Sequence, residues 1–402
     1  MILINYETCC ALSAAFKLKE FKALGKPLTK NERLTRQARG QEIDRVPTLG
    51  GWVAGVRNLS QIAGLSPDEY LANPMRAVIK ANLALDVDGM INPVVPKSLG
   101  EIRTDAILDG SFADVQPEAL VEYANSLPDG EKEILASFDT TAEEAHYREY
   151  FETAFRDWEG IQPLPNFWEI GGHFPLYVDF GYSAFLMACV LYPQAVGKIY
   201  WVKSLRTRER AKILVRLYKE YDLVPVMFCG EDLANNKGPM VSPAFLRQYY
   251  LPTVKMIIEP LVDAGVRFIH HCDGDIRPLL DDYIEIGFSG FQGFQYELGV
   301  DLYEIRKKRS KLGEELLFFT GMSVSRTLPF GSPQDIRDEV DYFLDATDGG
   351  KGMFLITSNV AGVEVPVENL QTAYYYVKQW DPTGSRKPRF QQWPWGISHP
   401  DR

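Results

Sequence analysis

Residues 267–275 read RFIHHCDGD, an apolar run of β-forming residues that closes in two imidazoles, a thiol and two carboxylates around a glycine. Seven more runs of this kind, short, mostly apolar and ending in glycine or polar residues, alternate with amphipathic helical stretches. The eight runs are 45–53, 88–95, 166–172, 224–231, 267–274, 287–295, 316–323 and 352–358. Continuous apolar strands that alternate with helices are typical of parallel sheets buried on both faces, so the pattern predicts an α/β protein with a (β/α)8 TIM barrel.

Serine–proline pairs indicate where the helices between these strands begin. Ser66-Pro67, Ser242-Pro243 and Ser332-Pro333 each join a capping hydroxyl to a proline that fits the first helical turn. Near the N-terminus, Thr29 and Glu32 have the spacing of a capping box, which predicts a helix that runs toward Gly40.

The chain has 402 residues, about 150 more than the ~250 of a minimal barrel. We assign the surplus to a helical N-terminal extension, an insertion after the second strand and a C-terminal tail. The predicted boundaries are 1–44 for the extension, 45–380 for the barrel, about 96–164 for the insertion within it and 381–402 for the tail. In the insertion we expect a polar hairpin at Ile102–Val115 and an aromatic-rich helix that is capped by Thr141 and packs against the barrel.

Composition and missing motifs exclude several classes of function. A net charge of -11 without a basic stripe argues against nucleic acid as a partner. No apolar run reaches the ~18 residues of a membrane helix and no leader is evident, so we expect a cytoplasmic protein that does not bind a membrane. The absence of a glycine-rich loop with lysine, of G-x-S-x-G and of H-E-x-x-H leaves nucleotide hydrolysis, serine esterase and zincin chemistry without support.

The polar residues at the strand ends are the candidates for catalysis, because the site of such a barrel lies at the C-terminal ends of its strands. Strand alternation places His271 and Asp273 on one face and His270 and Cys272 on the other, so one pair can face the mouth while the other packs under a helix. Such groups are costly to bury without partners, which favours a functional site over the alternative of a structural hydrogen-bond network.

The fourth run ends in the adjacent carboxylates Glu231 and Asp232. Neighbouring strand ends lie close together, so either carboxylate can approach His271 and Asp273. Carboxylates and an imidazole in one cleft form an acid/base site or a metal site with hard ligands, although an acidic pair alone more often belongs to a solvated loop. We therefore predict His271, Asp273, Glu231 and Asp232 as catalytic residues.

Further side chains near the predicted strand ends are candidates for substrate binding. The predicted set is Trp52, Asn92, Trp168, His173, Gln292, Gln295, Met322 and Asn359. The aromatic members and Met322 would give an apolar wall suited to a flat organic ligand, and the amides would orient it. The alternative for each is an ordinary structural role, in the core for the apolar residues and in backbone hydrogen bonds for the polar ones.

Five segments of the chain, taken in this order, resemble the uroporphyrinogen decarboxylase superfamily, and the resemblance spans about residues 29–378. They are LTKNERLTRQARGQEIDRVP, DLVPVMFCGEDLANNKGPMVSPAFLRQYYLP, RFIHHCDGDIRPLLDDYIEIGFSGFQ, LGVDLYEIRKKR and GGKGMFLITSNVAGVEVPVENL. The resemblance implies a (β/α)8 barrel with its site at the C-terminal mouth. It also implies one of two activities, decarboxylation or corrinoid-dependent methyl transfer.

Porphyrinogen decarboxylases carry an arginine-rich M-R-Q-A-G-R segment just after the Val-Pro of the first strand. Here TLGGWVAG follows Val46-Pro47, and the similar Arg36–Gly40 segment precedes the strand. A porphyrin with many carboxylates needs cationic partners there, so we disfavour porphyrinogen as the substrate.

The coenzyme M methyltransferases of the superfamily hold zinc with a His-x-Cys-Gly at the fifth strand and a cysteine after the eighth. An alignment on the glycine puts His271 at the histidine, Asp273 at the first cysteine and Asn359 near the second. A shift of one residue would instead pair His270 with Cys272. Because thiolates suit a zinc ion that activates a thiol, a histidine with carboxylates suits one that polarises an oxygen.

The resemblance and these residues together favour a substrate:corrinoid protein methyltransferase, an O-demethylase for a methoxylated aromatic. We expect zinc held by His271, Asp273 and Glu231, and cobalamin carried by a separate corrinoid protein that docks at the barrel mouth. Two alternatives remain at this point: a decarboxylase or other lyase that uses Asp273 or Glu231 as an acid on a small aromatic or carboxylated substrate, and a non-catalytic binding protein. Members of the superfamily are often dimers, so a homodimer is one possible assembly.

Overall fold

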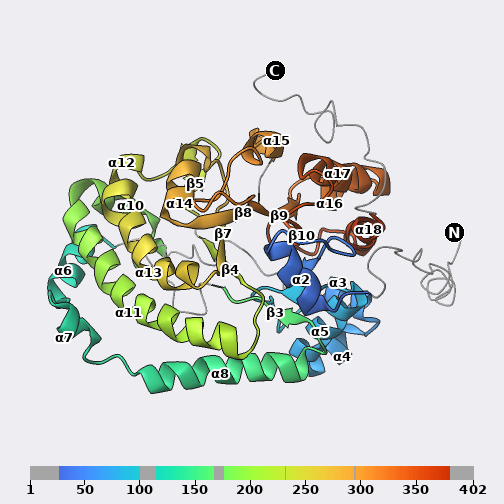
Figure 1. Ribbon diagram of the computed structural model, residues 1–402, viewed down its shortest axis with the longest axis horizontal. Helices are drawn as coiled ribbons and strands as arrows, with labels where there is room; N and C mark the ends of the chain where they lie inside the picture. Colours follow the sequence, from blue (N-terminus) through green and yellow to red (C-terminus); the bar gives the residue numbers. More distant parts are fainter. Residues whose placement is uncertain (1–26, 100–114, 167–175, 231, 294–295, 381–402) are drawn as a thin grey trace, which may run out of the picture.

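The computed structural model describes residues 27–99, 115–166, 176–230, 232–293 and 296–380. Eight parallel strands lie in two sheets (Figure 1). The smaller sheet has the order β1-β2-β3 (Leu49–Gly50, Gly89–Met90, Gln162–Pro163), and the larger has the order β10-β9-β8-β7-β4 (Met353–Thr357, Leu317–Met322, Phe288–Gln292, Arg267–His271, Val226–Gly230). A short antiparallel pair, β5 (Ala234–Asn235) and β6 (Gly238–Pro239), follows β4.

Single parallel bridges link the edges of the two sheets. Thr48 pairs with Leu355 of β10, and Asn166 pairs with Phe228 of β4. The predicted parallel α/β architecture is therefore confirmed as a curled sheet of the TIM-barrel type, and complete closure of a barrel stays a prediction.

Seven of the eight predicted runs contain the expected strand, whereas β3 begins four residues before the run at 166–172. Pro163 and Pro165 have no backbone N–H to donate to a neighbouring strand. They are tolerated because β3 pairs with β2 through the N–H groups of Gln162 and Leu164, which donate to the carbonyls of Asp88 and Met90. Most of the run that we expected, 167–172, lies outside the described residues.

Helices surround the strands (Figure 1). Ten of the described helices are α2 (Lys30–Ala38), α5 (Pro74–Ala84), α8 (Thr140–Asp157), α9 (Tyr177–Phe180), α10 (Tyr182–Leu191), α11 (Pro193–Glu220), α12 (Pro243–Phe245), α14 (Leu280–Ile286), α17 (Pro333–Ala346) and α18 (Val367–Lys378). The others are α3 (Val56–Ala63), α4 (Pro67–Ala72), α6 (Glu118–Ser126), α7 (Glu131–Leu135), α13 (Leu251–Asp263), α15 (Leu302–Ile305) and α16 (Thr327–Phe330). No single described helix has the length and hydropathy of a membrane span, and α10 with α11 meets that test only as a pair bent by 112°.

The expected caps are confirmed at four helices. Ser66, Ser242 and Ser332 each accept a hydrogen bond from a backbone N–H three residues on, at the starts of α4, α12 and α17. Thr29 and Glu32 form the predicted capping box of α2. The cap predicted at Thr141 is wrong: Asp139 accepts from the N–H groups of Thr141 and Ala142, so α8 begins two residues earlier.

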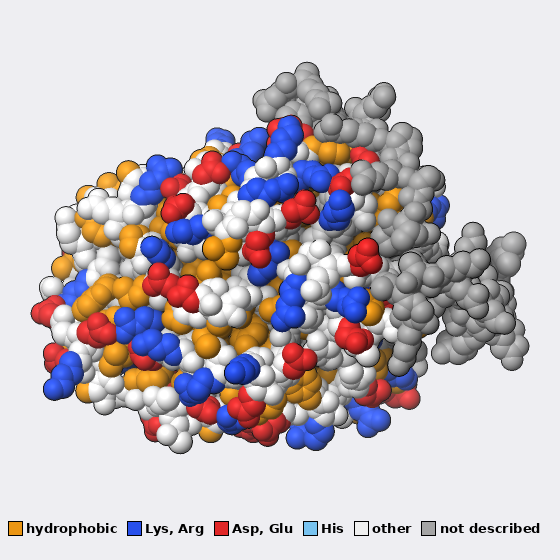
Figure 2. Space-filling view, in the orientation of Figure 1, with side chains coloured by type: hydrophobic (Ala, Val, Ile, Leu, Met, Phe, Trp, Pro, Cys, Tyr) orange, Lys and Arg blue, Asp and Glu red, His pale blue; other side chains and the backbone are white. Residues whose placement is uncertain are grey.

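The insertion contributes a long outer helix. The helix α8 lies beneath α11 in the view of Figure 1 and is tied to it by the ion pairs Arg148–Glu220 and Arg210–Glu143. Figure 2 shows acidic and basic side chains interspersed over this face. Among the aromatic residues of this segment, Phe151 and Trp158 are buried whereas Phe155 is 38% exposed. The hairpin that we expected at Ile102–Val115 lies outside the described residues except for Val115.

Alternate strand residues fill the space enclosed by the sheets. A buried apolar cluster joins residues two apart in the same strand, such as Val226 with Phe228 in β4 and Leu317 with Phe319 in β9. Ile269 of β7 belongs to the same cluster. Because side chains alternate along a strand, His271 has the inward parity of Ile269 and continues this interior toward the carboxyl end of the sheet.

A buried charge network ties the start of the barrel to α2. The carboxylate of Asp88 accepts hydrogen bonds from Arg33 (2.6 Å), from Arg45 (2.8 and 3.0 Å) and from the backbone N–H of Thr48 (2.9 Å). Asp44 binds Arg33 from the other side. Asp88 is fully buried, so its negative charge is compensated entirely by these partners.

We predict that Asp88→Asn lowers the free energy of unfolding by about 3–5 kcal/mol, because it leaves two buried guanidinium groups without part of their compensation. Urea denaturation followed by circular dichroism measures the change. Asp157→Asn is the matched control, since Asp157 pairs with Arg156 on the surface and its loss should have little effect. Equal midpoints for the two variants would contradict the importance of the network.

Candidate functional site

Three ionisable side chains meet at the carboxyl ends of β4 and β7. Asp232, His271 and Asp273 each offer one ligand atom, and these atoms lie within 4.8 Å of one another. Nε2 of His271 is 3.8 Å from Oδ1 of Asp232, and the same oxygen accepts a hydrogen bond from the backbone N–H of Asp273 (2.8 Å). The group has the chemistry of a proton-transfer site or of a site for a cation with nitrogen and oxygen ligands.

A close approach of two strands makes this group possible. Gly230 is paired with His271 in the parallel register of β4 and β7. A Cβ atom at Gly230 would lie 1.9 Å from the carbonyl oxygen of His271, so only glycine permits this spacing. The carboxylate of Asp232, two residues on, is thereby brought to the imidazole.

Two amides hold the site residues from outside. Asn359 follows β10 and donates from Nδ2 to Oδ2 of Asp273 at 2.5 Å. Gln292, at the end of β8, presents its carbonyl oxygen to Nδ1 of His271. All three members of the group therefore have a hydrogen-bond partner that fixes their orientation.

Aromatic rings border the imidazole of His271. The ring centroid of Trp52 lies 5.8 Å away in an edge-on arrangement, and that of Phe228 lies 5.7 Å away. Trp52 is fixed in turn, because its indole N–H donates to the carbonyl of Ile91 (3.0 Å). Trp52 thus borders the site as we expected, although it is also part of the buried core.

Sequence analysis missed a pair of tyrosines near this group. Tyr177 of α9 and Tyr182 of α10 stack with ring centroids 4.0 Å apart. Burial raises the pKa of Tyr182, a hydrogen bond with Tyr177 lowers it and the negative charge of Asp232 raises it again, which places this phenol within electrostatic range of the site. Two tyrosines five residues apart in a helical stretch have no distinctive pattern, so no signal in the sequence pointed to them.

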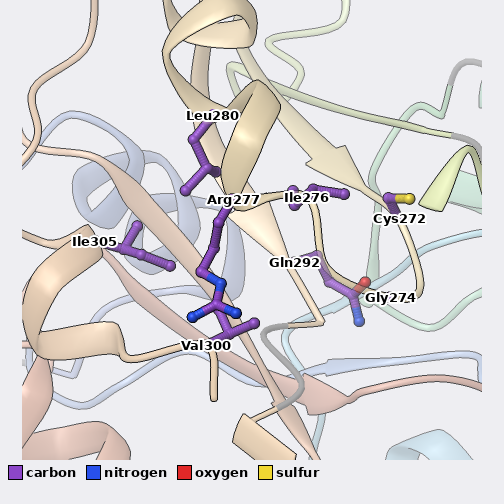
Figure 3. A pocket seen from close by; sticks show the side chains of 8 residues that line it. All are labelled: Cys272, Gly274, Ile276, Arg277, Leu280, Gln292, Val300 and Ile305. Atoms are coloured by element: carbon purple, nitrogen blue, oxygen red, sulfur yellow. The ribbon is translucent and has the colours of Figure 1, made fainter. Parts of the chain in front are cut away.

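His270 and Cys272, on the opposite face of the same strand end, have structural roles. His270 stacks on Tyr283 of α14, with ring centroids 3.8 Å apart, as expected for the pair that packs under a helix. Cys272 is one of the residues that line a small pocket (Figure 3), and its thiol donates to the backbone carbonyl of Asp273 (3.1 Å). Of the two registers that we considered for the metal ligands, the structure therefore presents His271 and Asp273 together, and not His270 and Cys272.

The remaining predicted residues have different outcomes. Glu231, Trp168, His173 and Gln295 lie outside the described residues. Asn92 is exposed in a left-handed conformation after β2. Met322 is fully buried in the main core cluster, which gives it the structural role that was its alternative. Gln292 is also buried, and its amide contacts His271, so its substrate contact stays a prediction.

Burial raises the pKa of the Asp273 carboxyl above its ordinary value. A positive charge on His271 would lower it, the charge of Asp232 raises it and the hydrogen bond from Asn359 lowers it again. Asp273 consequently keeps its proton to higher pH than a carboxyl in water, unless a cation lies beside it.

Comparisons with known proteins agree with this architecture. Residues 230–380 match the model of the uroporphyrinogen decarboxylase (URO-D) family, which covers the strands from β7 to β10 and Asp232. A methyltransferase from Methanosarcina mazei has a similar structure, with a TM-score of 0.55 and 15% sequence identity over 87% of this chain and 98% of that chain. A search of curated proteins finds no match. At this identity the structural similarity establishes the fold alone.

We predict that metal-free wild type loses stability relative to Asp273→Asn as the pH rises from about 4. The pKa of Asp273 is raised in the folded state, so between its ordinary value and its folded value the native protein binds more protons than the unfolded chain. The difference in free energy of unfolding should therefore change with a slope of at most about 1.4 kcal/mol per pH unit and then level off. Denaturation in chelator at pH 4 to 8 measures it, and a difference independent of pH would contradict the raised pKa.

Proposed function

We propose that this protein is a substrate:corrinoid protein methyltransferase, an O-demethylase that moves the methyl group of a methoxylated aromatic to the cobalt of a separate corrinoid protein. The proposal rests on the group formed by Asp232, His271 and Asp273, which offers one nitrogen and two oxygen ligands and no thiolate. Oxygen-rich sites suit the activation of an oxygen leaving group. The match to the URO-D family model and the fold shared with a methyltransferase support the same class.

The three side chains fit a zinc ion with an open fourth position. A catalytic zinc site uses three protein ligands, and ligand atoms about 2 Å from the metal in a tetrahedron lie about 3.3 Å apart. The candidate atoms here lie within 4.8 Å of one another, so small side-chain movements bring them to that spacing. Asp232 is the third ligand of the proposed site, and Glu231, the ligand expected from the sequence, lies outside the described residues. When bound, the zinc would supply Lewis-acid polarisation of the ether oxygen.

The residues of the chain account for the rest of the chemistry. Cleavage of the bond between the methyl carbon and the oxygen leaves the electron pair on the oxygen, so the phenoxide needs a positive charge or a proton. His271 would hold the cation through Nε2, and Asp273 would hold it through a buried carboxylate. Asp232, whose side chain is 42% exposed, would be the third ligand, and the phenoxide would take its proton from solvent.

The aromatic border of the site supports His271 from the interior. Trp52 and Phe228 flank the imidazole and are buried, 6% and 0% exposed, so the methoxylated ring would bind on the open side of the site, away from them. The cobalt would approach from the carboxyl ends of the strands, where the corrinoid protein would dock. Asn92, exposed after β2, would contact the docked partner or the substrate.

One observation favours a second candidate, a decarboxylase-like lyase on a small aromatic or carboxylated substrate. Burial keeps the proton on Asp273 to higher pH than usual, as a general acid requires. The match of residues 230–380 to the URO-D family model is compatible with this reaction. It needs neither a metal nor a corrinoid partner, and this difference separates the two candidates.

We predict about one zinc per chain in the purified wild type and a strong loss of zinc in His271→Ala, because a site with three protein ligands loses its only nitrogen. Elemental analysis after dialysis measures the content. The control is His146→Ala, which removes an exposed imidazole of α8 and should leave the zinc content unchanged. Equal zinc in all three proteins, or none in any, would contradict the metal site.

We predict that the zinc-loaded protein transfers a methyl group from a methoxyphenol to reduced cobalamin, supplied free or on a corrinoid protein, and that His271→Ala abolishes the transfer. Absorbance spectroscopy detects methylcobalamin, and chromatography detects the demethylated phenol. Full activity on glycine betaine and none on a methoxyphenol would contradict the proposed substrate. Release of carbon dioxide from an aromatic acid without cobalamin would establish the lyase instead.

A further inference from the structure

Gln292 occupies the space between β7 and β10 behind the site. Its side chain is 1% exposed. The amide nitrogen donates to two backbone carbonyls at the end of β10, those of Thr357 (3.1 Å) and Ser358 (2.9 Å). In Figure 3 its carboxamide is turned away from Leu280 and Ile305, which line the neighbouring pocket.

These two hydrogen bonds fix which end of the amide faces His271. A backbone carbonyl only accepts, so the NH2 group must lie toward Thr357 and Ser358. A flipped amide would direct its oxygen at two carbonyl oxygens and leave all three buried acceptors unsatisfied. The carbonyl oxygen of Gln292 is therefore held against Nδ1 of His271.

This orientation determines where the imidazole carries its proton. The oxygen of Gln292 can only accept a hydrogen bond, so Nδ1 must donate and therefore carries a hydrogen. In the neutral ring the lone pair is then on Nε2, the nitrogen that faces Asp232 at 3.8 Å.

We propose that Gln292 is a positioning residue that holds His271 in the Nδ1–H tautomer and thereby directs a bare Nε2 lone pair at Asp232 and Asp273. The tautomer does not depend on any bound ligand. Its consequence for zinc rests on the proposed function: a ligand whose tautomer is fixed in advance binds a metal without first moving its proton.

A second glutamine offers a matched control. Gln37 of α2 is 2% exposed, and its amide nitrogen donates to two backbone carbonyls that flank the start of β10, those of Gly350 (2.6 Å) and Met353 (2.7 Å). It makes the same kind of structural bridge as Gln292 at the opposite end of the same strand. Gln37→Met therefore reproduces the loss of packing and of two buried hydrogen bonds without touching His271.

The experiment is nitrogen NMR of protein labelled in histidine, which has five such residues, in metal-free form at pH 8. In a neutral ring the protonated and the bare nitrogen resonate far apart, so the spectrum reports the tautomer directly. Loss of a signal in His271→Gln assigns His271. Wild type, Gln292→Met, Gln292→Glu and Gln37→Met are then compared, and zinc affinity is measured for each by competition with a chelating dye.

We predict the Nδ1–H form for His271 in wild type and in Gln37→Met. Gln292→Glu should keep it, because a carboxylate still accepts from Nδ1, whereas Gln292→Met should release the ring to a mixture or to the Nε2–H form. Zinc affinity should fall about 10- to 100-fold in Gln292→Met and little in Gln37→Met. If Gln292 had only a structural role, Gln292→Glu would disturb the protein more than Gln292→Met, because it buries a charge. The expected order of the two variants is therefore the opposite of the order for a purely structural role.

An Nε2–H ring in wild type would overturn the proposal without the need for any variant, as would an unchanged Nδ1–H ring in a folded Gln292→Met. If wild type shows the expected tautomer but binds no zinc, the positioning role of Gln292 stands and the metal-dependent mechanism fails. The two proposals are therefore tested separately.

Discussion

The register between β4 and β7 is the constraint on which the rest of the site depends. Gly230 opposes His271, and only a residue without a Cβ allows the two strands to approach this closely. The chain then turns so that the carboxylate of Asp232 accepts the backbone N–H of Asp273. One backbone contact thus brings together two carboxylates and an imidazole from strands that are separate in the sequence. A slip of one residue would present His270 and Cys272 instead, because side chains alternate along a strand.

The strand β10 is held at both ends by buried glutamines, and the two serve different purposes. Gln37 satisfies carbonyls near its start and joins the strand to α2. Gln292 satisfies carbonyls at its end, but its remaining acceptor contacts an imidazole. The side-chain amide of Gln37 therefore has only a structural role. The side-chain amide of Gln292 has the same structural role and in addition positions His271. The hydrogen bonds of Gln292 at the end of β10 thus determine which nitrogen of His271 carries the proton.

Much of the fold and part of the site follow from simple periodicity. The alternation of side chains along a strand was enough to predict that His271 and Asp273 share a face. The parallel arrangement of neighbouring strands was enough to predict that the end of β4 lies beside them. The position of β3 did not follow, because Pro163 and Pro165 suggest a loop until the hydrogen-bonding partners of Gln162 and Leu164 are known. The role of Gln292 depends on carbonyls of residues 357 and 358, which lie far away in the sequence. Such contacts leave no local pattern, and neither does the stacking of Tyr177 on Tyr182.

The charges at the site explain why its donor set suits a cation. Two carboxylates and an imidazole face one another, and the neutral donors that contact the carboxylates include an amide of Asn359 and the backbone N–H of Asp273. Burial penalises this negative charge, and the raised pKa of Asp273 is the result. Either a proton or a metal ion relieves that penalty. A proton leaves an acid suited to a lyase, whereas a divalent cation returns both carboxylates to their charged form and leaves an electrophile for an ether oxygen. A protonated site that acts as a lyase has no need for a free Nε2 lone pair on His271, whereas a metal site uses it as a ligand. This difference is the structural reason to favour the metal site.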